Sequence, residues 1–365
     1  MGKINPNIPY NNLPKIPPEI ELETIPIMRR LADARAALAE MKGIGEIIPN
    51  QSMLINSLTI REAKDSSEIE NIITTQDDLY IAFASKRGNI NPQTKEVLNY
   101  REALWFGFNI IRKRGILTTN DITSIQKRIT ANDAGIRTQP GTQLKNSLTG
   151  QVIFTPPVGE NLIRSLMKNL EDYINIDNDE IDPLIKLGII HYQFESIHPY
   201  YDGNGRTGRI INILYLVLKG LLDIPILYLS SFIIKEKKEY YRLLKDVRIN
   251  NKWEEWILYI LIGIEKTAKQ TTIAIKGIKD LLERTIEQVN TDLPSIYSKE
   301  LIETIFEQPY CKVSSLVDKG LYERRTAMKY LRELEQVGIL KAIPKGNQVL
   351  FLNINLYNLL KQDSL

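Results

Sequence analysis

The chain has 365 residues, of which 43% are hydrophobic and 25% are charged, a composition typical of a globular protein with two or three domains. Its net charge of +3 is too small to indicate nucleic-acid binding by itself, and no apolar run approaches the roughly 20 residues of a membrane-spanning helix. The segment Met1–Pro6 lacks the apolar core of a signal peptide. A single cysteine, Cys311, excludes an internal disulfide framework, so we expect a cytoplasmic protein in which Cys311 is buried beside a helix.

The first 80 residues are predicted to form an N-terminal helical region. A proline- and asparagine-rich stretch over residues 8–18 should be extended and irregular. A helix rich in alanine and leucine follows from Glu23 to Met41, and Ile48-Pro49-Asn50 interrupts the helical pattern. The pattern resumes from Leu54 to Ile73 and then dominates residues 81–283. The sequence therefore predicts a mainly α-helical protein.

The helix predicted over residues 54–73 carries a distinctive segment, Ser66-Ser67-Glu68-Ile69-Glu70-Asn71. Ser66 and Glu70 are one helical turn apart and share a face, and Asn71 lies beside them. Taken alone, the segment is explained equally by a surface helix or by a serine cap followed by acidic residues.

A short β-prone run interrupts the helical core. The run Gln151-Val152-Ile153-Phe154 is stopped by the prolines at 156 and 157, as in an ordinary edge strand. A loop from Gly135 to Gly141 precedes it. This run is expected to be the main interruption of the helical pattern before residue 283.

The most informative stretch runs from His198 to Arg209 and contains Gly203-Asn204-Gly205. Glycines on both sides of Asn204 allow successive backbone N–H groups to turn inward and form a concave anion site. The apolar run that follows predicts a buried helix, whose N-terminus also favours an anion. Arg206 and Arg209 are three residues apart, so both project from one face of the first turn and can reach a polyphosphate.

Two further side chains in this stretch suit chemistry on a nucleotide. His198 is a proton acceptor near neutral pH, and Asp202 is a carboxylate suited to hold hydrated magnesium beside phosphates. The other histidine, His191, has Leu187 and Phe194 at helical spacing and is predicted to be a buried, hydrogen-bonded helix residue. A glycine-rich turn between two helices, with solvated arginines, is the structural alternative.

The full pattern resembles the Fic family signature, His-Pro-Phe-x-Asp/Glu-Gly-Asn-Gly-Arg-x-x-Arg. Only Tyr200 departs from the commonest form, and it replaces Phe by another aromatic residue that can fill the same buried position. The resemblance implies a Fic helical core with a short β-hairpin called the flap. It also implies a protein adenylyltransferase, a nucleotidyltransferase that moves AMP from ATP onto a Ser, Thr or Tyr hydroxyl of a target protein and of itself.

The resemblance assigns roles to individual residues of this chain. His198 would deprotonate the target hydroxyl, Asp202 would hold Mg²⁺, and Arg206 and Arg209 would bind the β/γ end of ATP. The other ATP-binding positions would be Gly203, Asn204, Gly205, Thr207, Gly208 and, from a segment resembling the adenine pocket, Tyr241. The flap, at Gln151, Val152, Ile153 and Phe154, would register the main chain of the target by strand addition. Gly205 argues against the relatives that transfer phosphate, which carry a lysine inside the loop.

The upstream segment resembles the family's inhibitory helix, Ser/Thr-x-x-x-Glu-Gly/Asn, here formed by Ser66, Glu70 and Asn71. The glutamate of that helix pairs with the second motif arginine, which is Arg209 in this chain. Autoinhibition of transfer is therefore implied. Two alternatives remain at this point: Glu70 could orient a water that removes AMP from a target, or the core could sense nucleotide for a DNA-binding regulator.

Residues 295–365 have a different pattern, with helices predicted at 298–306, 313–317 and 323–337. Strands at 340–343 and 348–352, separated by Pro344–Asn347, should form a hairpin. Three helices and a hairpin indicate a winged helix-turn-helix, whose third helix would read any bound DNA. Residues 296–365 carry ten Lys and Arg against eight Asp and Glu, which is meagre for a phosphate-binding surface. We expect protein binding or homodimerisation in preference to DNA binding.

Overall fold

The computed structural model describes residues 5–48, 50–84, 90–145, 149–176, 180–345 and 348–361. Helices dominate these residues, as predicted, and the β-structure consists of two small sheets. The helices up to residue 292 are α1 (Ile25–Ile47), α2 (Gln51–Ile69), α3 (Gln76–Ala84), α4 (Pro92–Arg114), α5 (Thr119–Thr130), α6 (Glu160–Asn175), α7 (Pro183–Ile197), α8 (Asn204–Leu218), α9 (Leu229–Lys235), α10 (Lys237–Asn250) and α11 (Trp253–Asp292).

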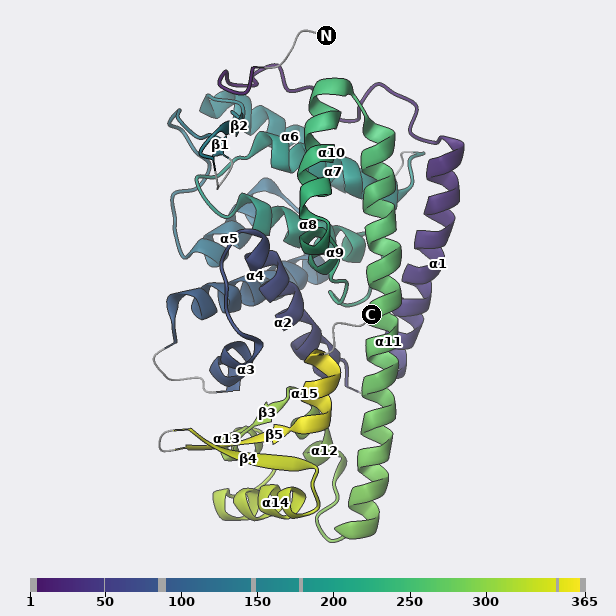
Figure 1. The fold of residues 1–365 in the computed structure, drawn as a ribbon, viewed down its shortest axis with the longest axis vertical. Coiled ribbons are helices and arrows are strands. Elements are labelled where there is room, and N and C mark those ends of the chain that lie inside the picture. Colours follow the sequence, from purple (N-terminus) through teal and green to yellow (C-terminus); the bar gives the residue numbers. More distant parts are fainter. Residues whose placement is uncertain are drawn as a thin grey trace.

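Two central helices, α7 and α8, form the core around which the others pack. Nearly all of their residues are buried, and α8 contacts α2, α4, α5 and α7 (Figure 1). α7 begins where it does because Asp182 caps the helix by accepting from the Leu184 N–H at 2.8 Å and Pro183 occupies the first turn. α11 fastens the outer side, since the Trp256 indole donates to the Gly188 carbonyl at 2.8 Å. The two helices that the loop connects are therefore packed against α2, α4, α5, α6 and α11.

The helix predicted from Leu54 to Ile73 ends earlier than expected. α2 stops at Ile69, Glu70 is its C-cap, and Asn71 has the left-handed φ of 63° that ends a helix. The ammonium group of Lys237 donates to the Ile69 carbonyl at 2.6 Å and satisfies one of the free carbonyls at this end. Glu70 and Asn71 therefore lie just outside the helix.

The predicted β-prone run is the second strand of a hairpin. β1 (Leu144–Lys145) and β2 (Val152–Phe154) are antiparallel, with Leu144 opposite Phe154. Gln151 precedes β2. The N-terminal segment lies against the end of this hairpin, because the Tyr10 N–H donates to the Thr155 carbonyl at 3.0 Å.

The long helix α11 runs from the helical core down to the C-terminal segment, and α1 lies alongside it (Figure 1). The domain boundary predicted at residue 283 falls inside this helix, which continues to Asp292. A division of the chain into residues 1–80, 81–283 and 295–365 stays a prediction.

The C-terminal segment contains the expected helices and hairpin. They are α12 (Lys299–Phe306), α13 (Val313–Asp318), α14 (Arg324–Gln336), β4 (Leu340–Lys345) and β5 (Gln348–Asn353). A short strand, β3 (Tyr310–Cys311), and a last helix, α15 (Ile354–Lys361), were not expected, and the antiparallel sheet has the order β3-β5-β4. Residues 346–347 of the predicted turn lie outside the described residues. Cys311 is buried just before α13, as expected. Assignment to the winged-helix class stays a prediction.

Within the described ranges, the helices include none with the length and apolar character needed to cross a bilayer.

The close packing of α4 against α5 and α8 makes a testable prediction about Gly107. A Cβ at this position would meet the Leu214 side chain and lie 2.9 Å from Ile125 Cδ1, so Gly107→Ala overpacks a rigid contact. We expect the free energy of unfolding to fall by about 1–3 kcal/mol. Gly43→Ala in α1 is the matched control, because open space surrounds its Cβ and alanine should raise stability by about 0.5–1 kcal/mol. Urea denaturation measures both, and equal midpoints for the two variants would contradict the packing argument.

Candidate active site

The candidate site begins where α7 ends. His198 is the C-cap of α7 in a left-handed conformation, with φ 49° and ψ 60°, and its N–H donates to the Phe194 carbonyl at 3.0 Å. A residue with a Cβ is uncommon in this region of backbone space, and it is held there only where surrounding contacts define the conformation. This turn directs the chain out of α7 and into the loop before α8.

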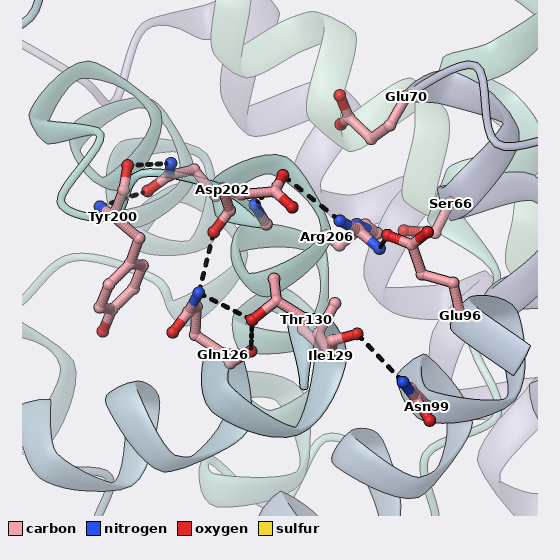
Figure 2. A network of polar contacts seen from close by, with 12 residues as sticks. Ser66, Glu70, Glu96, Asn99, Gln126, Ile129, Thr130, Tyr200, Asp202 and Arg206 are labelled. Carbon is pink, nitrogen blue, oxygen red and sulfur yellow. Dashed lines mark hydrogen bonds and ion pairs between the residues drawn. The ribbon is translucent and has the colours of Figure 1, made fainter. Parts of the chain in front are cut away.

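The loop is braced by two of its own residues. The Asn204 side chain accepts from the Tyr200 N–H at 2.9 Å and donates to the Tyr200 carbonyl at 2.7 Å (Figure 2). Tyr200 is fully buried, and its hydroxyl lies 3.0 Å from the Thr123 hydroxyl, so the Tyr-for-Phe replacement fills the expected slot. The Asn204 side-chain amide thus holds the loop. Asn204 can therefore contact a ligand only through its backbone.

The two glycines of the motif serve different purposes. Gly203 has a left-handed φ of 79°, whereas Gly205 lies in the first turn of α8 with ordinary helical backbone. The prediction that both glycines turn backbone N–H groups inward to an anion stays a prediction; here the Gly203 N–H donates to Asp202 Oδ1 at 2.6 Å. Gly205 is needed for close approach, because a Cβ there would collide with Glu70 Oε1.

Arg209 is buried and held by three acceptors from the end of α2. Its side chain is 2% exposed; Nε donates to Ser66 Oγ, and Nη2 donates to both the Ser66 carbonyl and Glu70 Oε1, each at 2.8 Å. The predicted pairing of Glu70 with the second motif arginine is therefore present. Among the described residues, the hydrogen-bond partners of Arg209 are Ser66 and Glu70, and Asn71 instead supplies the turn that follows Glu70.

Arg206 is equally buried and has its own carboxylate partners. Its guanidinium donates to Glu96 of α4 and lies 3.5 Å from Asp202 (Figure 2). Sequence reasoning missed Glu96. A buried arginine requires a counter-charge, but the motif gives no sign that it comes from a helix more than 100 residues earlier.

Asp202 presents its carboxylate to solvent. The side chain is 72% exposed, and Oδ1 accepts from the Gly203 N–H at 2.6 Å, while the Asp202 carbonyl accepts from Gln126 Nε2 at 2.9 Å (Figure 2). The backbone of this residue is therefore fixed while its acidic group stays accessible. An exposed carboxylate beside an anion site suits a hydrated divalent cation.

The loop and the first turn of α8, together with residues from α4 and the segment after α2, line one cavity of about 360 Å³. It brings together the sequence-predicted His198, Asp202 and Gly203–Arg206 with Glu70, and it adds neighbours that were not predicted; its lining is Glu70, Ile72, Glu96, His198, Tyr201, Asp202, Gly203, Asn204, Gly205 and Arg206. The cavity is the place where a ligand can contact the motif.

Some predicted site residues lie away from this cavity. Thr207 is fully buried, and Gly208 faces α7, where a Cβ would lie 2.7 Å from Glu195 Oε1. The helical period turns these two residues toward the core. Tyr241 lies on α10, 43% exposed, with its ring against Tyr240 at 5.1 Å, and it is absent from the lining of the cavity.

Both imidazoles are held in the neutral form. Burial, followed by the nearby positive charge of Arg137, lowers the pKa of His198 to about 4, and its Nδ1 is buried without a hydrogen-bond partner in the described residues. Burial also lowers the pKa of His191 to about 3. The prediction for His191 is confirmed, since it is fully buried and its ring nitrogens contact the Tyr240 hydroxyl at 2.8 Å and Asn212 Nδ2 at 3.0 Å.

The Glu70 carboxyl group is held in the ionised form. Removal from water would raise its pKa, but the facing Arg209 charge and hydrogen bond outweigh that effect, and the net pKa is lowered. Arg206 and His198 act in the same direction. The carboxylate is therefore a negative charge beside the first turn of α8, where helix N-termini attract anions.

Three family models match the chain. They are described as "Fic/DOC family N-terminal" over residues 28–109, "Fic/DOC family" over 116–216 and "Protein adenylyltransferase SoFic-like, C-terminal domain" over 281–356. The chain belongs to the Fic/DOC family. The Fic/DOC match over 116–216 contains the whole motif, and the N-terminal match contains Glu70.

Curated relatives in the Fic/DOC family resemble parts of the chain. The protein adenylyltransferase fic-1 of Caenorhabditis elegans is 31% identical over 170 residues, covering 45% of this chain and 30% of the relative. The probable protein adenylyltransferase aq_aa38 of Aquifex aeolicus is 31% identical over 134 residues, covering 36% and 35% respectively. The chain thus spans about a third of the length of these relatives.

Solved structures support the fold. A Fic family protein from Desulfovibrio desulfuricans G20 superposes with a TM-score of 0.57 at 20% identity, covering 92% of this chain and 98% of that one. A Fic-domain signalling protein from Bacteroides thetaiotaomicron gives a TM-score of 0.55 at 17% identity, covering 67% and 95%. The predicted Fic helical core is confirmed by these similarities.

The low pKa of each imidazole makes a prediction for titration of the nucleotide-free protein. Because both pKa values lie below the ordinary 6.5, the folded protein should bind no proton at either ring between about pH 8 and pH 5. NMR of the imidazole C–H signals should show His198 titrating near pH 4. The unfolded chain binds these protons below 6.5, so stability should fall as the pH drops from 6.5 toward 4. The urea-unfolded protein is the control; a folded-state midpoint near 6.5 for His198 would contradict the argument.

Proposed function

We propose that this chain is a protein adenylyltransferase that moves AMP from ATP onto a Ser, Thr or Tyr hydroxyl of a target protein, and that Glu70 holds it inactive. The observation that carries the proposal is the cavity in which a neutral His198 faces Asp202 and the glycine-rich first turn of α8. The membership in the Fic/DOC family and the names of its curated relatives support the same reaction.

The first turn of α8 is suited to bind the phosphates of ATP. The backbone N–H groups of this turn have no partner within the helix, Gly205 leaves room for close approach, and Arg206 borders the cavity. The carboxylate of Glu70 already lies against Gly205, which supports the view that an anion fits there. We propose that ATP places its phosphates along this turn.

Asp202 is the residue that would hold a magnesium ion. Its exposed carboxylate borders the same cavity as the helix N-terminus, and a single carboxylate together with substrate phosphates is the common way proteins bind Mg²⁺. The ion would supply positive charge that offsets the charge of the phosphates when it is bound. Asp202 needs no other protein ligand for this role, because the phosphates and waters complete the coordination.

His198 acts as the general base in the proposed reaction. Its neutral imidazole accepts the proton of the target hydroxyl while the hydroxyl oxygen forms a bond to the α-phosphorus of ATP, and the bond to pyrophosphate breaks. The proton ends on His198 and the leaving pyrophosphate carries the displaced charge. Arg206 stabilises that charge, and the flap residues Gln151–Phe154 align the main chain of the target by strand addition.

Glu70 inhibits the reaction by occupying Arg209. The Arg209 guanidinium makes three hydrogen bonds to Ser66 and Glu70, so it is directed at α2 and away from an incoming polyphosphate. The negative charge of Glu70 at the α8 N-terminus further opposes a phosphate there. Release of Glu70 would free Arg209 for the γ-phosphate, the arrangement that supports in-line attack.

The C-terminal segment is proposed to bind protein or a second copy of this chain. Four of its basic side chains, Lys299, Lys319, Lys329 and Arg332, each pair with a glutamate of the same segment. Arg324 and Arg325 at the start of α14 are exposed but stand alone at that end. This charge distribution gives weak support to DNA binding.

Replacement of Glu70 tests the inhibitory role. Glu70→Gly should raise incorporation of α-labelled AMP into the protein and into cell-extract targets by about 5- to 150-fold, the usual range of a coupling between two sites. Glu68→Ala is the control, because Glu68 lies on the last turn of α2 and pairs with Lys64 outside the cavity, and alanine removes its carboxylate without weakening the helix. No rise with Glu70→Gly across several extracts would contradict inhibition. Glu70-dependent loss of AMP from a modified target would favour the hydrolytic alternative.

Replacement of His198 tests the base. In a Glu70→Gly background, His198→Ala should lower AMP transfer by about two to four orders of magnitude because the target hydroxyl loses its proton acceptor. Calorimetric ATP affinity should remain close to that of the Glu70→Gly parent, since other groups hold the phosphates. A large loss of affinity with residual turnover would instead identify His198 as a ligand of the nucleotide.

A further inference from the structure

Arg137, in the loop before the flap, is a buried cation that the motif does not account for. Its side chain is 1% exposed and reaches three backbone carbonyls. Nε donates to the His198 carbonyl at 2.8 Å, and Nη2 donates to the Ile197 carbonyl at 3.2 Å and to the Pro157 carbonyl. One guanidinium group therefore joins the end of α7 to the segment that follows β2.

The two carbonyls of Ile197 and His198 lie on either side of the His198 Cα, where the chain turns out of α7. His198 has a left-handed backbone, which is unfavourable for a residue with a Cβ. Fork-shaped donation to two successive carbonyls fixes that turn because the guanidinium group is planar and its donors point in set directions. The backbone conformation that aims the His198 imidazole thus depends on Arg137.

The rest of the same loop is attached to the motif as well. The Arg137 N–H donates to the Pro199 carbonyl at 2.9 Å, and Ile136 forms an antiparallel bridge with Tyr200. The Tyr201 hydroxyl accepts from the N–H groups of Thr138 and Gln139, both at 3.0 Å. Residues 136–139 therefore lie along the catalytic loop before the chain enters β1.

The contact to Pro157 closes the base of the flap. Arg137 precedes β1 and Pro157 follows β2, so the guanidinium group spans the two ends of the hairpin. The same end of β2 is also held by side-chain packing, because Phe154 packs against the Tyr10 ring and the Arg248 guanidinium. A displacement of the flap base would therefore shift Arg137 and, through it, the His198 backbone.

Burial of this arginine is unfavourable by itself. Among the described residues no carboxylate pairs with it, and its Nη1 is buried without a hydrogen-bond partner. An apolar side chain would avoid the desolvation penalty. The cost indicates a positioning function, since buried polar groups that are unfavourable for stability concentrate at functional sites.

We propose that Arg137 is a positioning residue that sets the distance between the flap and His198, and hence between the main chain of a bound target and the base. The proposal rests on the proposed function, because it concerns the same reaction. Its physical basis is the sensitivity of transfer to geometry: a misplacement of about 1 Å can cost about 100-fold in rate. Arg137 touches neither nucleotide nor target in this arrangement and acts through the two backbone segments.

The test uses Arg137→Lys in the full chain with the Glu70→Gly substitution. Lysine keeps the charge but cannot span the three carbonyls. We expect kcat/KM for the target to fall about 100-fold, with unchanged ATP affinity and a thermal midpoint within a few degrees of the parent. Arg164→Lys is the matched control, since Arg164 lies exposed on α6 and pairs only with Glu160 in the described residues.

A second measurement does not require activity. Hydrogen exchange should accelerate selectively at the amides of Ile153, Phe154 and Tyr200 in Arg137→Lys, because the base of the flap and the catalytic loop lose their common anchor. Selective acceleration without any transfer in either background would support the coupling and refute the proposed function. Unchanged exchange, or a rate loss matched by equal losses of ATP affinity and thermal stability, would overturn the positioning role of Arg137.

Discussion

The structure depends on the burial of two guanidinium groups at the first turn of α8. Arg206 and Arg209 are both 2% exposed, and a buried charge is costly unless an opposite charge and hydrogen bonds accompany it. Arg206 pairs with Glu96 of α4 and Asp202 of the loop. Arg209 donates to Ser66 and Glu70 at the end of α2. These ion pairs and hydrogen bonds therefore hold α2 and α4, both from the N-terminal third of the chain, against α8.

The site is polar and yet ordered, because its loop is held by hydrogen bonds and packing within the protein. The loop between α7 and α8 is held by the Asn204 amide group and by the buried Tyr200, so the motif has its shape before any ligand arrives. Pre-organised donors of this kind contribute to catalysis because they need not reorient as charge develops. Under the proposed inhibition, release would change the partner of Arg209, while the loop itself would keep its conformation.

The part of the site that is contiguous in sequence could be predicted, and the part assembled from distant helices could not. The residues from His198 to Arg209 meet because they are neighbours on a helix end and a short loop, and His191 was correctly expected in the core from its helical spacing. Glu96 and Arg137 carry no motif, and their relation to Arg206 and His198 appears only when the tertiary structure is formed.

Errors in the predicted elements have local physical causes. The second helix was extended to Ile73 because Ile69 and Ile73 continue an apolar spacing, but the left-handed backbone of Asn71 ends it. Thr207 and Gly208, which the motif groups with the phosphate-binding residues, lie inside a helix that starts at Asn204: Thr207 is fully buried and Gly208 faces Glu195 of α7, and their phosphate-binding role stays a prediction. β3 and α15 were missed because a two-residue strand and an eight-residue helix carry weak periodic signals.

Under the proposed inhibition, the position of Glu70 at the C-cap of α2 sets the free energy needed to withdraw its carboxylate. Glu70, Asn71 and Ile72 close the helix through backbone bonds to Ser67 and Glu68, and the Lys237 ammonium holds the last carbonyl. Helix ends open locally with free energies far below that of global unfolding. Withdrawal of the carboxylate therefore requires only that a single turn frays, with the buried body of α2 left in place. Such an equilibrium would respond to temperature and to contacts at the helix end, so the proposed inhibition would be graded in its response.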